Sequence, residues 1–431
     1  MLKPNDPVYF SSVIFNGYQN NFWQNLYDEA PPNSGGRFAI NLARRINPNR
    51  FVSRDASAWS LPWNQPVWPG FELPTYNPNF SMSFEEATDL RALEIKDRIN
   101  THGEKFAMMW SGGIDSTLAL SALIKNLTKS ELANIVVCTG TIALIENPEF
   151  WHKFVHGKFQ MFDSLKVKYH DLIGLGYRPI TCDEGDCIFG TAFGLSLYYN
   201  WEPYADKMSA ESRAHIASII DRATDPEVHF SQFKDLLIAY FQIPRKQGFP
   251  WPSIDEPDPD FGRLLYEKYA KSAMTTDVPI RSLHDFFWWL IFNVKYLNCA
   301  VRGSLYFNDH IPVQQCVDTI VNWFNADNYQ LWSMANNNNG QKIKHTAASY
   351  KWAAREYIYS VDKNIYYKNF KLKLESMGVA TYKQDVSNLP LATRPNARFG
   401  IDSNYNLLYI DQPDVQEYIR HHIMNFEIDW G

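Results

Sequence analysis

Short apolar runs alternate with helical patterns along the first half of the chain. Three such runs predict buried strands, and they span 105–110, 134–138 and 178–182. The segments between them predict helices at 118–124 and 149–165. A further helix is predicted over 83–100, where Ser83 with Glu86 three positions later gives the capping-box pattern of a helix start. Because strands alternate with helices, we expect parallel β-α-β units with right-handed crossovers, and so an α/β fold.

Beyond residue 200 the pattern becomes helical. Five segments predict helices, and they span 211–221, 230–241, 261–272, 283–299 and 312–324. The N-terminal segment is irregular, since its five prolines between 62 and 78 forbid a regular helix. A strand-like run at 406–410 lies near the other end of the chain. We therefore divide the chain into an irregular segment, an α/β core, a largely helical half and a C-terminal extension, at 1–82, 83–200, 201–378 and 379–431.

Composition and charge narrow the class of protein. The chain has 431 residues and a formal net charge of −6, whereas domains that hold nucleic acid by overall charge are strongly basic. The longest fully apolar run, 286–292, is too short for a bilayer span of about 20 residues, and no secretory signal begins the chain. The five cysteines form no CxxC pair and no structural zinc pattern. We expect a cytoplasmic protein without membrane segments, and nucleic acid is a less favoured partner.

The seven residues after the first predicted strand carry the strongest chemical signal. They are Ser111, Gly112, Gly113, Ile114, Asp115, Ser116 and Thr117. Two glycines let the backbone turn tightly and approach an anion, toward which backbone amides and a helix start can point. Asp115 would repel a phosphate unless a cation lay between them, so we expect Mg²⁺ to bridge Asp115 and phosphate oxygens. The lysine and the spacing of a Walker A loop are absent.

This segment resembles the SGGxDS fingerprint of the PP-loop ATP pyrophosphatases, and every fixed position of the fingerprint matches. The resemblance implies a doubly wound parallel sheet and cleavage of ATP to AMP and pyrophosphate. It also implies that the seven fingerprint residues bind the nucleotide. The adenine is then expected near the ends of the first two strands, at Trp110 and Cys138.

A second segment, 182–190, resembles a G-x-G-x-D-E-L-F-G sequence of asparagine-synthetase-like enzymes, which follows a strand and gives an aspartate to the metal. Asp186 matches that aspartate, and the Phe and Gly that end the sequence also match. Gly185 occupies the variable position before the aspartate and is expected to belong to the nucleotide-binding set. The resemblance implies that Asp115 and Asp186 share Mg²⁺ at the carboxyl edge of the sheet.

Three positions of this second segment depart from the family pattern. Cys182 and Glu184 replace its two glycines, which could alter the backbone of the loop. Cys187 replaces the acidic residue after the aspartate, which is expected to remove a negative charge near the pyrophosphate.

A third segment, with Lys351 and Arg355, resembles the K-x-x-L-R segment of the same enzymes, with Ala354 in place of Leu. The resemblance implies that Lys351 reaches the phosphates and the adenylate and that Arg355 belongs to the catalytic set. Eight Lys and Arg against two acids in 342–373 suit an anionic ligand, although a solvated basic helix face is an alternative.

Taken together, the resemblances cover about 83–375 and imply a ligase that adenylates a small-molecule acid and transfers it to ammonia or an amine. No cysteine precedes Cys138, and about 100 residues precede the fingerprint, so we expect no glutaminase in this chain. Ammonia would be free or supplied by a separate protein. Two alternatives stay open: a PP-loop enzyme that modifies a nucleobase or nucleic acid, and a non-catalytic ATP-binding module.

Three smaller features lie outside these motifs. Glu146 follows the second predicted strand and is a candidate for nucleotide or substrate contacts. His152 and His156 are four residues apart, but no third ligand is evident, which favours surface histidines over a metal site. The segment 332–336 is expected to be either a lid that excludes water or a plain surface loop.

Overall fold

The computed structural model describes most of the α/β core and much of the helical half. The described residues are 8–9, 54–55, 59–60, 66–68, 71–140, 143, 146–164, 167, 169–190, 209–223, 225–242, 259–296, 299–300, 318–335, 351–370, 400–401 and 407–408. Most of the predicted irregular segment and C-terminal extension lies outside these ranges, as do Lys342, Lys344, Lys371 and Lys373. Within them, no helix is both long and apolar enough to cross a membrane.

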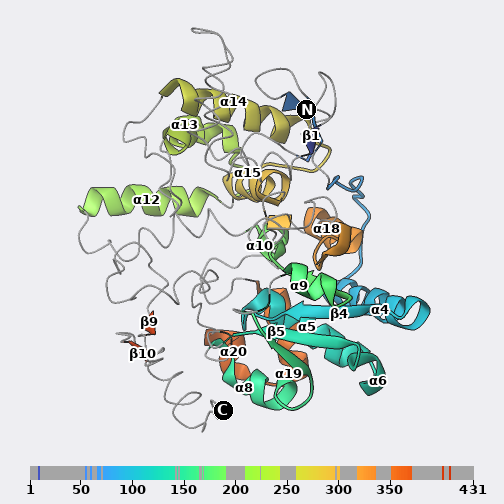
Figure 1. The fold of residues 1–431 in the computed structure, drawn as a ribbon. Helices are drawn as coiled ribbons and strands as arrows, with labels where there is room; N and C mark the ends of the chain where they lie inside the picture. The colour runs from blue at the N-terminus through green and yellow to red at the C-terminus, as the bar shows by residue number, and fades with distance from the viewer. Residues whose placement is uncertain are drawn as a thin grey trace, which may run out of the picture.

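Five parallel strands form one sheet in the order β6-β5-β4-β7-β8. Figure 1 shows two of them, β4 and β5, side by side. β4 (Lys105–Met109) pairs with β5 (Ile135–Thr139) on one side and with β7 (Tyr177–Thr181) on the other. β6 (Gln160–Asp163) and β8 (Val321–Asn322) form the two edges. The chain builds outward from β4 in both directions, so the strand order reverses between β4 and β7. The predicted α/β class is confirmed.

Side chains of the central strands alternate between the two faces of the sheet. Phe106 and Met108 of β4 belong to the main core, together with the apolar side chains of α5 (Ile114–Asn126). Ala107 belongs to a second cluster with Leu172 of α9 (Tyr169–Gly174). Apolar packing therefore covers both faces, and the ends of the strands are left to carry polar groups.

Helix α4 (Phe84–His102) begins where the sequence predicts. The backbone N–H of Glu86 donates to Ser83 Oγ at 3.1 Å, and the N–H of Ser83 donates to Glu86 Oε2 at 2.8 Å, which completes the capping box. The helix ends at Gly103, whose left-handed backbone (φ 63°) lets its N–H reach the last turn.

The helix predicted over 149–165 is wrong in its second half. α8 (Pro148–Phe150) continues into the π-helix η2 (Trp151–Val155), and Gly157 then adopts a left-handed backbone (φ 68°) that ends the helical path. Gln160–Asp163 form the edge strand β6 instead. Its side chains are mostly exposed, so the sequence carries no apolar run there.

The remaining helices lie mostly in the predicted helical half. They are α6 (Lys129–Leu132), α10 (Gly185–Phe189), α12 (Ala210–Ala223), η4 (Phe230–Phe233), α13 (Lys234–Gln242), α14 (Pro259–Thr275), α15 (Leu283–Leu290), η5 (Ile291–Lys295), α18 (Asp327–Ala335), α19 (Trp352–Asp362) and α20 (Ile365–Phe370). The predicted helix 283–299 turns from α-helix to π-helix after Leu290. The range 312–324, predicted as helix, contains strand β8, so that prediction is wrong at its end.

Two small sheets lie outside the core. β3 (Pro66–Trp68) pairs with β1 (Val8–Tyr9) and β2 (Trp59–Ser60), and Pro66 is tolerated because it is the first residue of its strand. β9 (Gly400–Ile401) and β10 (Leu407–Leu408) pair antiparallel, which places a strand within the predicted run 406–410.

Trp332 lies on α18 in an aromatic core, although the sequence suggested a lid or a surface loop. It is buried, and its ring centroid lies 4.8 Å from that of Phe84 and 5.7 Å from that of Phe189. Both suggestions are wrong for 332–335, because these residues belong to a helix whose aromatic side chains pack into the core. Residue 336 lies outside the described part of the chain.

Candidate functional site

The predicted glycine turn joins β4 to α5. Gly112 has a left-handed backbone (φ 70°), and a Cβ there would overlap the carbonyl oxygen of Ala143 and the Cβ of Glu146. The hydroxyl of Tyr367 donates to the carbonyl of Gly112 at 2.9 Å. Only glycine therefore fits this position, which explains why the sequence carries one.

Helix α5 starts at Ile114, four residues earlier than predicted, so Ile114, Asp115, Ser116 and Thr117 form its first turn. Gly113 is the N-cap of α5 and has no side chain that could accept hydrogen bonds from the first-turn amides. The hydroxyls of Ser111 and Ser116 lie 3.0 Å apart and close the turn on itself. This uncapped helix start fits the predicted anion-binding role of the segment.

The second predicted segment lies at the end of the neighbouring strand. After β7, Asp186 occupies the first turn of the short helix α10, which lies below α15 and beside α18 in Figure 1. Gly185 faces Asp115, and a Cβ on Gly185 would overlap the Asp115 carboxyl group. The sequence treated Gly185 as a variable position, but its missing side chain is what lets the two segments approach.

Lys351 connects the two aspartates. Its Nζ is hydrogen-bonded to Asp115 Oδ2 and lies 2.8 Å from Asp186 Oδ1. Burial alone would lower the pKa of Lys351, but Asp115 and Asp186 raise it overall, so the lysine is a permanent cation. The structure thus brings together the three residues that the sequence selected from three separate segments.

The cluster is open on the aspartate side and closed on the lysine side. The Lys351 side chain is 4% exposed, whereas the side chains of Asp115 and Asp186 are 22% and 27% exposed. Lys351 is the N-cap residue of α19 and has a left-handed backbone (φ 55°). A ligand that arrives from solvent would meet the carboxylates first.

Lys295 is a member of this cluster that the sequence reasoning missed. Its Nζ lies 3.6 Å from Asp186 Oδ2, and its side chain is 36% exposed. It is the last residue of the π-helix η5, and π-helices recur at functional sites because they change the direction of side chains. The sequence offers one sign of a special position, because Lys295 is the only Lys or Arg between Arg281 and Arg302.

The three departures from the family pattern have little effect on the loop. Glu184 has an ordinary right-handed backbone (φ −77°, ψ −8°), and Cys182 has no positive φ, so neither position requires glycine. Cys187 points into the core, where its Sγ lies 3.8 Å from Sγ of Cys299. The expectation that Cys187 removes a charge near the pyrophosphate stays a prediction. Burial, followed by the charge of Glu184, raises the pKa of Cys182, so the thiol stays neutral.

Trp110 and Cys138, predicted near the adenine, lie behind the site. Both side chains are buried, and Trp110 stacks on Trp151 with ring centroids 6.1 Å apart. Trp110 Nε1 donates to Thr117 Oγ1 at 3.1 Å, so Thr117 is also part of this packing. Contacts from these positions to a nucleotide would come from the backbone.

Arg355 supports α19. Its Nη1 donates to the carbonyl of Lys368 on α20 at 2.7 Å, and the residue is buried. We therefore expect Arg355 to position Lys351, whereas the sequence suggested a catalytic role. The Nζ of Lys368 pairs with Glu356 at 2.7 Å, so the described cations of 342–373 do not form one open basic face.

The smaller candidates differ in their burial and in their distance from the glycine turn. Glu146 is buried beside the glycine turn, with Oε2 3.9 Å from the place of a Cβ on Gly113, so it stays a candidate. His152 lies on η2 and His156 directly follows it, and their ring centroids are 6.3 Å apart. His156 is exposed and His152 is half-buried.

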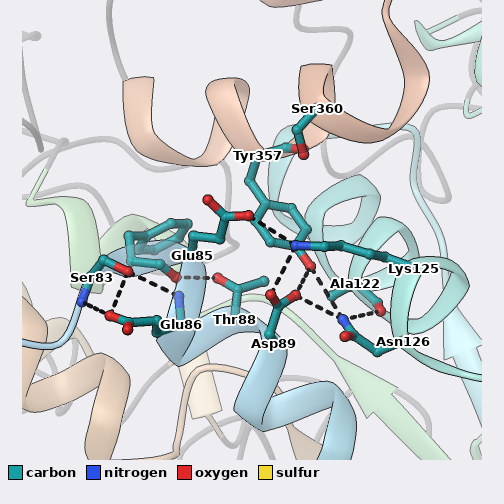
Figure 2. A network of polar contacts seen from close by, with 11 residues as sticks. Ser83, Glu85, Glu86, Thr88, Asp89, Ala122, Lys125, Asn126, Tyr357 and Ser360 are labelled. Atoms are coloured by element: carbon teal, nitrogen blue, oxygen red, sulfur yellow. Dashed lines mark hydrogen bonds and ion pairs between the residues drawn. The ribbon is translucent and has the colours of Figure 1, made fainter.

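A polar network fixes α19 to the helices that flank the sheet (Figure 2). Asp89 of α4 accepts hydrogen bonds from the Tyr357 hydroxyl of α19, from Lys125 Nζ at 2.8 Å and from Asn126 Nδ2 at 2.7 Å. Burial acts to raise the pKa of Asp89, but the hydrogen bonds from Lys125 and Tyr357 lower it overall. Burial and the bond to Asp89 raise the pKa of Tyr357. The network therefore holds the helix that carries Lys351.

The Tyr357→Phe variant should unfold with a free energy about 1–3 kcal/mol below that of the wild type, because Asp89 loses a hydrogen bond in a partly buried site. Urea unfolding monitored by tryptophan fluorescence measures this difference. Tyr359→Phe, on the same helix and away from Asp89, should change the stability by less than about 0.5 kcal/mol. Equal stability of the two variants would show that the network does not anchor α19.

A second prediction concerns Asp362, at the far end of α19. Burial, with a further contribution from Glu149, raises the pKa of Asp362 to about 7, although a backbone hydrogen bond from Asn364 and the charges of Lys153 and Lys363 lower it. A carboxyl group that is protonated in the folded protein and ionised in the unfolded chain destabilises the fold as pH rises from about 4 to 7.

We therefore expect Asp362→Asn to be more stable than the wild type at pH 8, by roughly 2–4 kcal/mol, and similar to it near pH 4. Urea unfolding at the two pH values measures the effect. Asp277→Asn removes an exposed carboxylate and should leave the difference between the two pH values unchanged. Parallel pH profiles of wild type and Asp362→Asn would contradict the assignment.

The donor set of the cluster fits a divalent cation of the Mg²⁺ type. Such ions are bound by one or two carboxylates together with phosphate oxygens of the substrate. Asp115 and Asp186 supply two carboxylates from neighbouring strand ends, on the partly exposed side of the cluster. These two residues would hold the ion, and the ion would complete its coordination with phosphate oxygens.

Comparisons with other proteins add no family to this picture: no family model, no curated protein and no solved structure matches the chain.

Proposed function

We propose that the chain is an ATP-dependent ligase of the PP-loop class, related to asparagine synthetase, that adenylates a carboxylate and passes the acyl group to ammonia or an amine. The observation that carries the proposal is the convergence of Asp115, Asp186 and Lys351. Each was selected by a separate motif, and Asp115 and Lys351 are 236 residues apart in the chain. Such convergence supports the view that the three motifs belong to one site.

The architecture of the sheet supports the same proposal. In open α/β sheets, ligands bind at the carboxyl ends of the strands where the strand order reverses. The reversal lies between β4 and β7, and the segments that follow these two strands carry Asp115 and Asp186. A doubly wound sheet of the PP-loop type has its nucleotide site at this point.

The chain's own residues divide the work as follows. The amides of the glycine turn and of the first turn of α5 would hold phosphate oxygens. The substrate carboxylate would attack the α-phosphorus of ATP, and the bond to the pyrophosphate oxygen would break. Lys351 would stabilise the charge on the leaving pyrophosphate, because its ammonium remains charged in a partly buried site. A Mg²⁺ ion on Asp115 and Asp186 would supply further neutralisation of that charge.

In the second half of the reaction, the amine would attack the carbonyl carbon of the acyl-adenylate and release AMP. Holding the acid and the amine in one site would supply a large part of the rate. The described cations in 342–373 give little support to the alternative of a nucleic-acid-modifying enzyme, since Lys351 and Lys368 are engaged in ion pairs with acids of the chain.

The test is a product analysis of α-labelled ATP incubated with Mg²⁺, the full chain and a panel of carboxylic acids with ammonia. Asp115→Ala and Asp186→Ala serve as inactive variants. We expect AMP and pyrophosphate from the wild type and neither product from the variants. Formation of ADP and phosphate would refute the PP-loop mechanism. Tight binding of ATP without cleavage, across the whole panel, would favour the non-catalytic binding module instead.

A further inference from the structure

Lys351 occupies the position between the two carboxylates that a shared divalent cation would take. Its Nζ is bonded to Asp115 Oδ2 and lies 2.8 Å from Asp186 Oδ1. Mg²⁺ needs carboxylate oxygens at about 2.0–2.1 Å in near-octahedral geometry. The ammonium and the ion therefore cannot use the same pair of oxygens at the same time.

We propose that Lys351 and a divalent cation exchange at Asp115 and Asp186, so that the ion binds firmly only when a phosphate-bearing ligand takes up the displaced ammonium. The inference rests on the proposed function for the presence of a metal and a nucleotide. It adds a second role for Lys351: before nucleotide and metal bind, its ammonium occupies the cation position between Asp115 and Asp186.

The charges of the cluster explain why the exchange needs a ligand. Two aspartates face two cations, Lys351 and Lys295, and the Nζ of Lys295 lies 3.6 Å from Asp186 Oδ2. A divalent ion added beside these two ammonium groups brings two more positive charges into a partly buried site, where repulsion between charges is much stronger than in water. The phosphates of a nucleotide supply the missing negative charge, and they also offer the ammonium a new partner.

The geometry lets the lysine move without disturbing the fold. The carboxylates are 22% and 27% exposed while the Lys351 side chain is 4% exposed, so the ion would approach from solvent and the ammonium from the interior. The exchange needs only rotation about the four-carbon stem of the lysine. The helix itself is held by Tyr357 and Arg355, through the contacts to Asp89 and to Lys368.

Mn²⁺ binding tests the exchange, with free Mn²⁺ measured by electron paramagnetic resonance in the absence of nucleotide. The full-length wild type is compared with Lys351→Met, which removes the cation, and with Lys351→Arg, which keeps it. Lys363→Met is the matched control, because it removes the same charge at the other, exposed end of α19.

We expect Lys351→Met to bind Mn²⁺ at least about tenfold more tightly than the wild type, because a competing cation next to a carboxylate changes its affinity for positive charge by one or more orders of magnitude. Lys351→Arg and Lys363→Met should bind Mn²⁺ as the wild type does. The same Lys351→Met variant should bind α,β-methylene-ATP more weakly. Equal or weaker Mn²⁺ binding by Lys351→Met would overturn the proposal.

A second readout uses only the wild type and so does not depend on the folding of a variant. Acetylation by an N-hydroxysuccinimide ester, followed by mass spectrometry, reports how reactive each lysine is, with Lys363 as internal reference. Saturating Mn²⁺ should increase the labelling of Lys351 relative to Lys363, because displacement from Asp115 and Asp186 frees an amine that the ion pairs otherwise hold. Unchanged relative labelling at saturating Mn²⁺ would show that ion and lysine bind together, and would overturn the exchange.

One further variant separates this inference from the proposed function. If Asp115→Asn leaves Mn²⁺ binding unchanged, the metal site itself is wrong, and both proposals fail. If Asp115→Asn weakens Mn²⁺ binding but Lys351→Met does not strengthen it, only the exchange fails.

Discussion

The Asp186→Asn variant is expected to release pyrophosphate from ATP about 10³-fold more slowly than the wild type. Asparagine keeps the size of the side chain but removes the charge that faces both Lys351 and Lys295. One of the two carboxylates proposed to hold Mg²⁺ is then lost, along with its share of transition-state stabilisation. Initial rates of pyrophosphate release at saturating ATP measure the effect.

Asp183→Asn is the matched control, because it makes the same change of charge three residues earlier in the same loop. It should retain a rate within about threefold of the wild type, as expected of a position outside the cluster. Equal losses in the two variants would indicate a general effect of charge on the loop and would remove Asp186 from the proposed metal site.

Gly185→Ala is expected to lower kcat/KM by about 10²-fold, because displacement of a reacting group by about 1 Å is enough for such a loss. A Cβ at this position would overlap the Asp115 carboxyl group, so Asp115 or the whole of α10 must move. The change adds no charge and removes no hydrogen-bonding side chain. Steady-state kinetics with ATP as the varied substrate measures the loss.

Gly174→Ala is the corresponding control. A Cβ there meets no atom within 4 Å, and its backbone is not left-handed. It should leave both kinetics and stability near those of the wild type. If Gly185→Ala were equally harmless, the contact between α10 and Asp115 would have no part in the geometry of the site.

Much of the central sheet follows from the sequence, and the exceptions have physical causes. The strands β4, β5 and β7 are predicted because they are buried and therefore apolar. β6 is missed because it is an exposed edge strand, and β8 because it has only two residues, Val321 and Asn322. Both edge strands form by pairing with β5 or β7, and a local sequence pattern does not reveal such pairing.

The candidate site divides in a similar way. Asp115, Asp186 and Lys351 are selected from local motifs, and the structure brings them together. Lys295 is missed because the π-helix η5 sets its direction, and the helical periodicity of the sequence does not reveal a π-helix. The need for glycine at 185 is also hidden, since it arises from contact with Asp115, which lies 70 residues earlier in the chain.

The most direct test of the account is ATP–pyrophosphate exchange, with labelled pyrophosphate, unlabelled ATP, Mg²⁺, a panel of carboxylic acids and no amine. Label should enter ATP only when a suitable acid is present, and Asp186→Asn and Lys351→Met should lose the exchange. This result would show reversible cleavage between the α- and β-phosphates at this cluster. Acid-dependent formation of ADP and phosphate, with no label in ATP, would contradict the account.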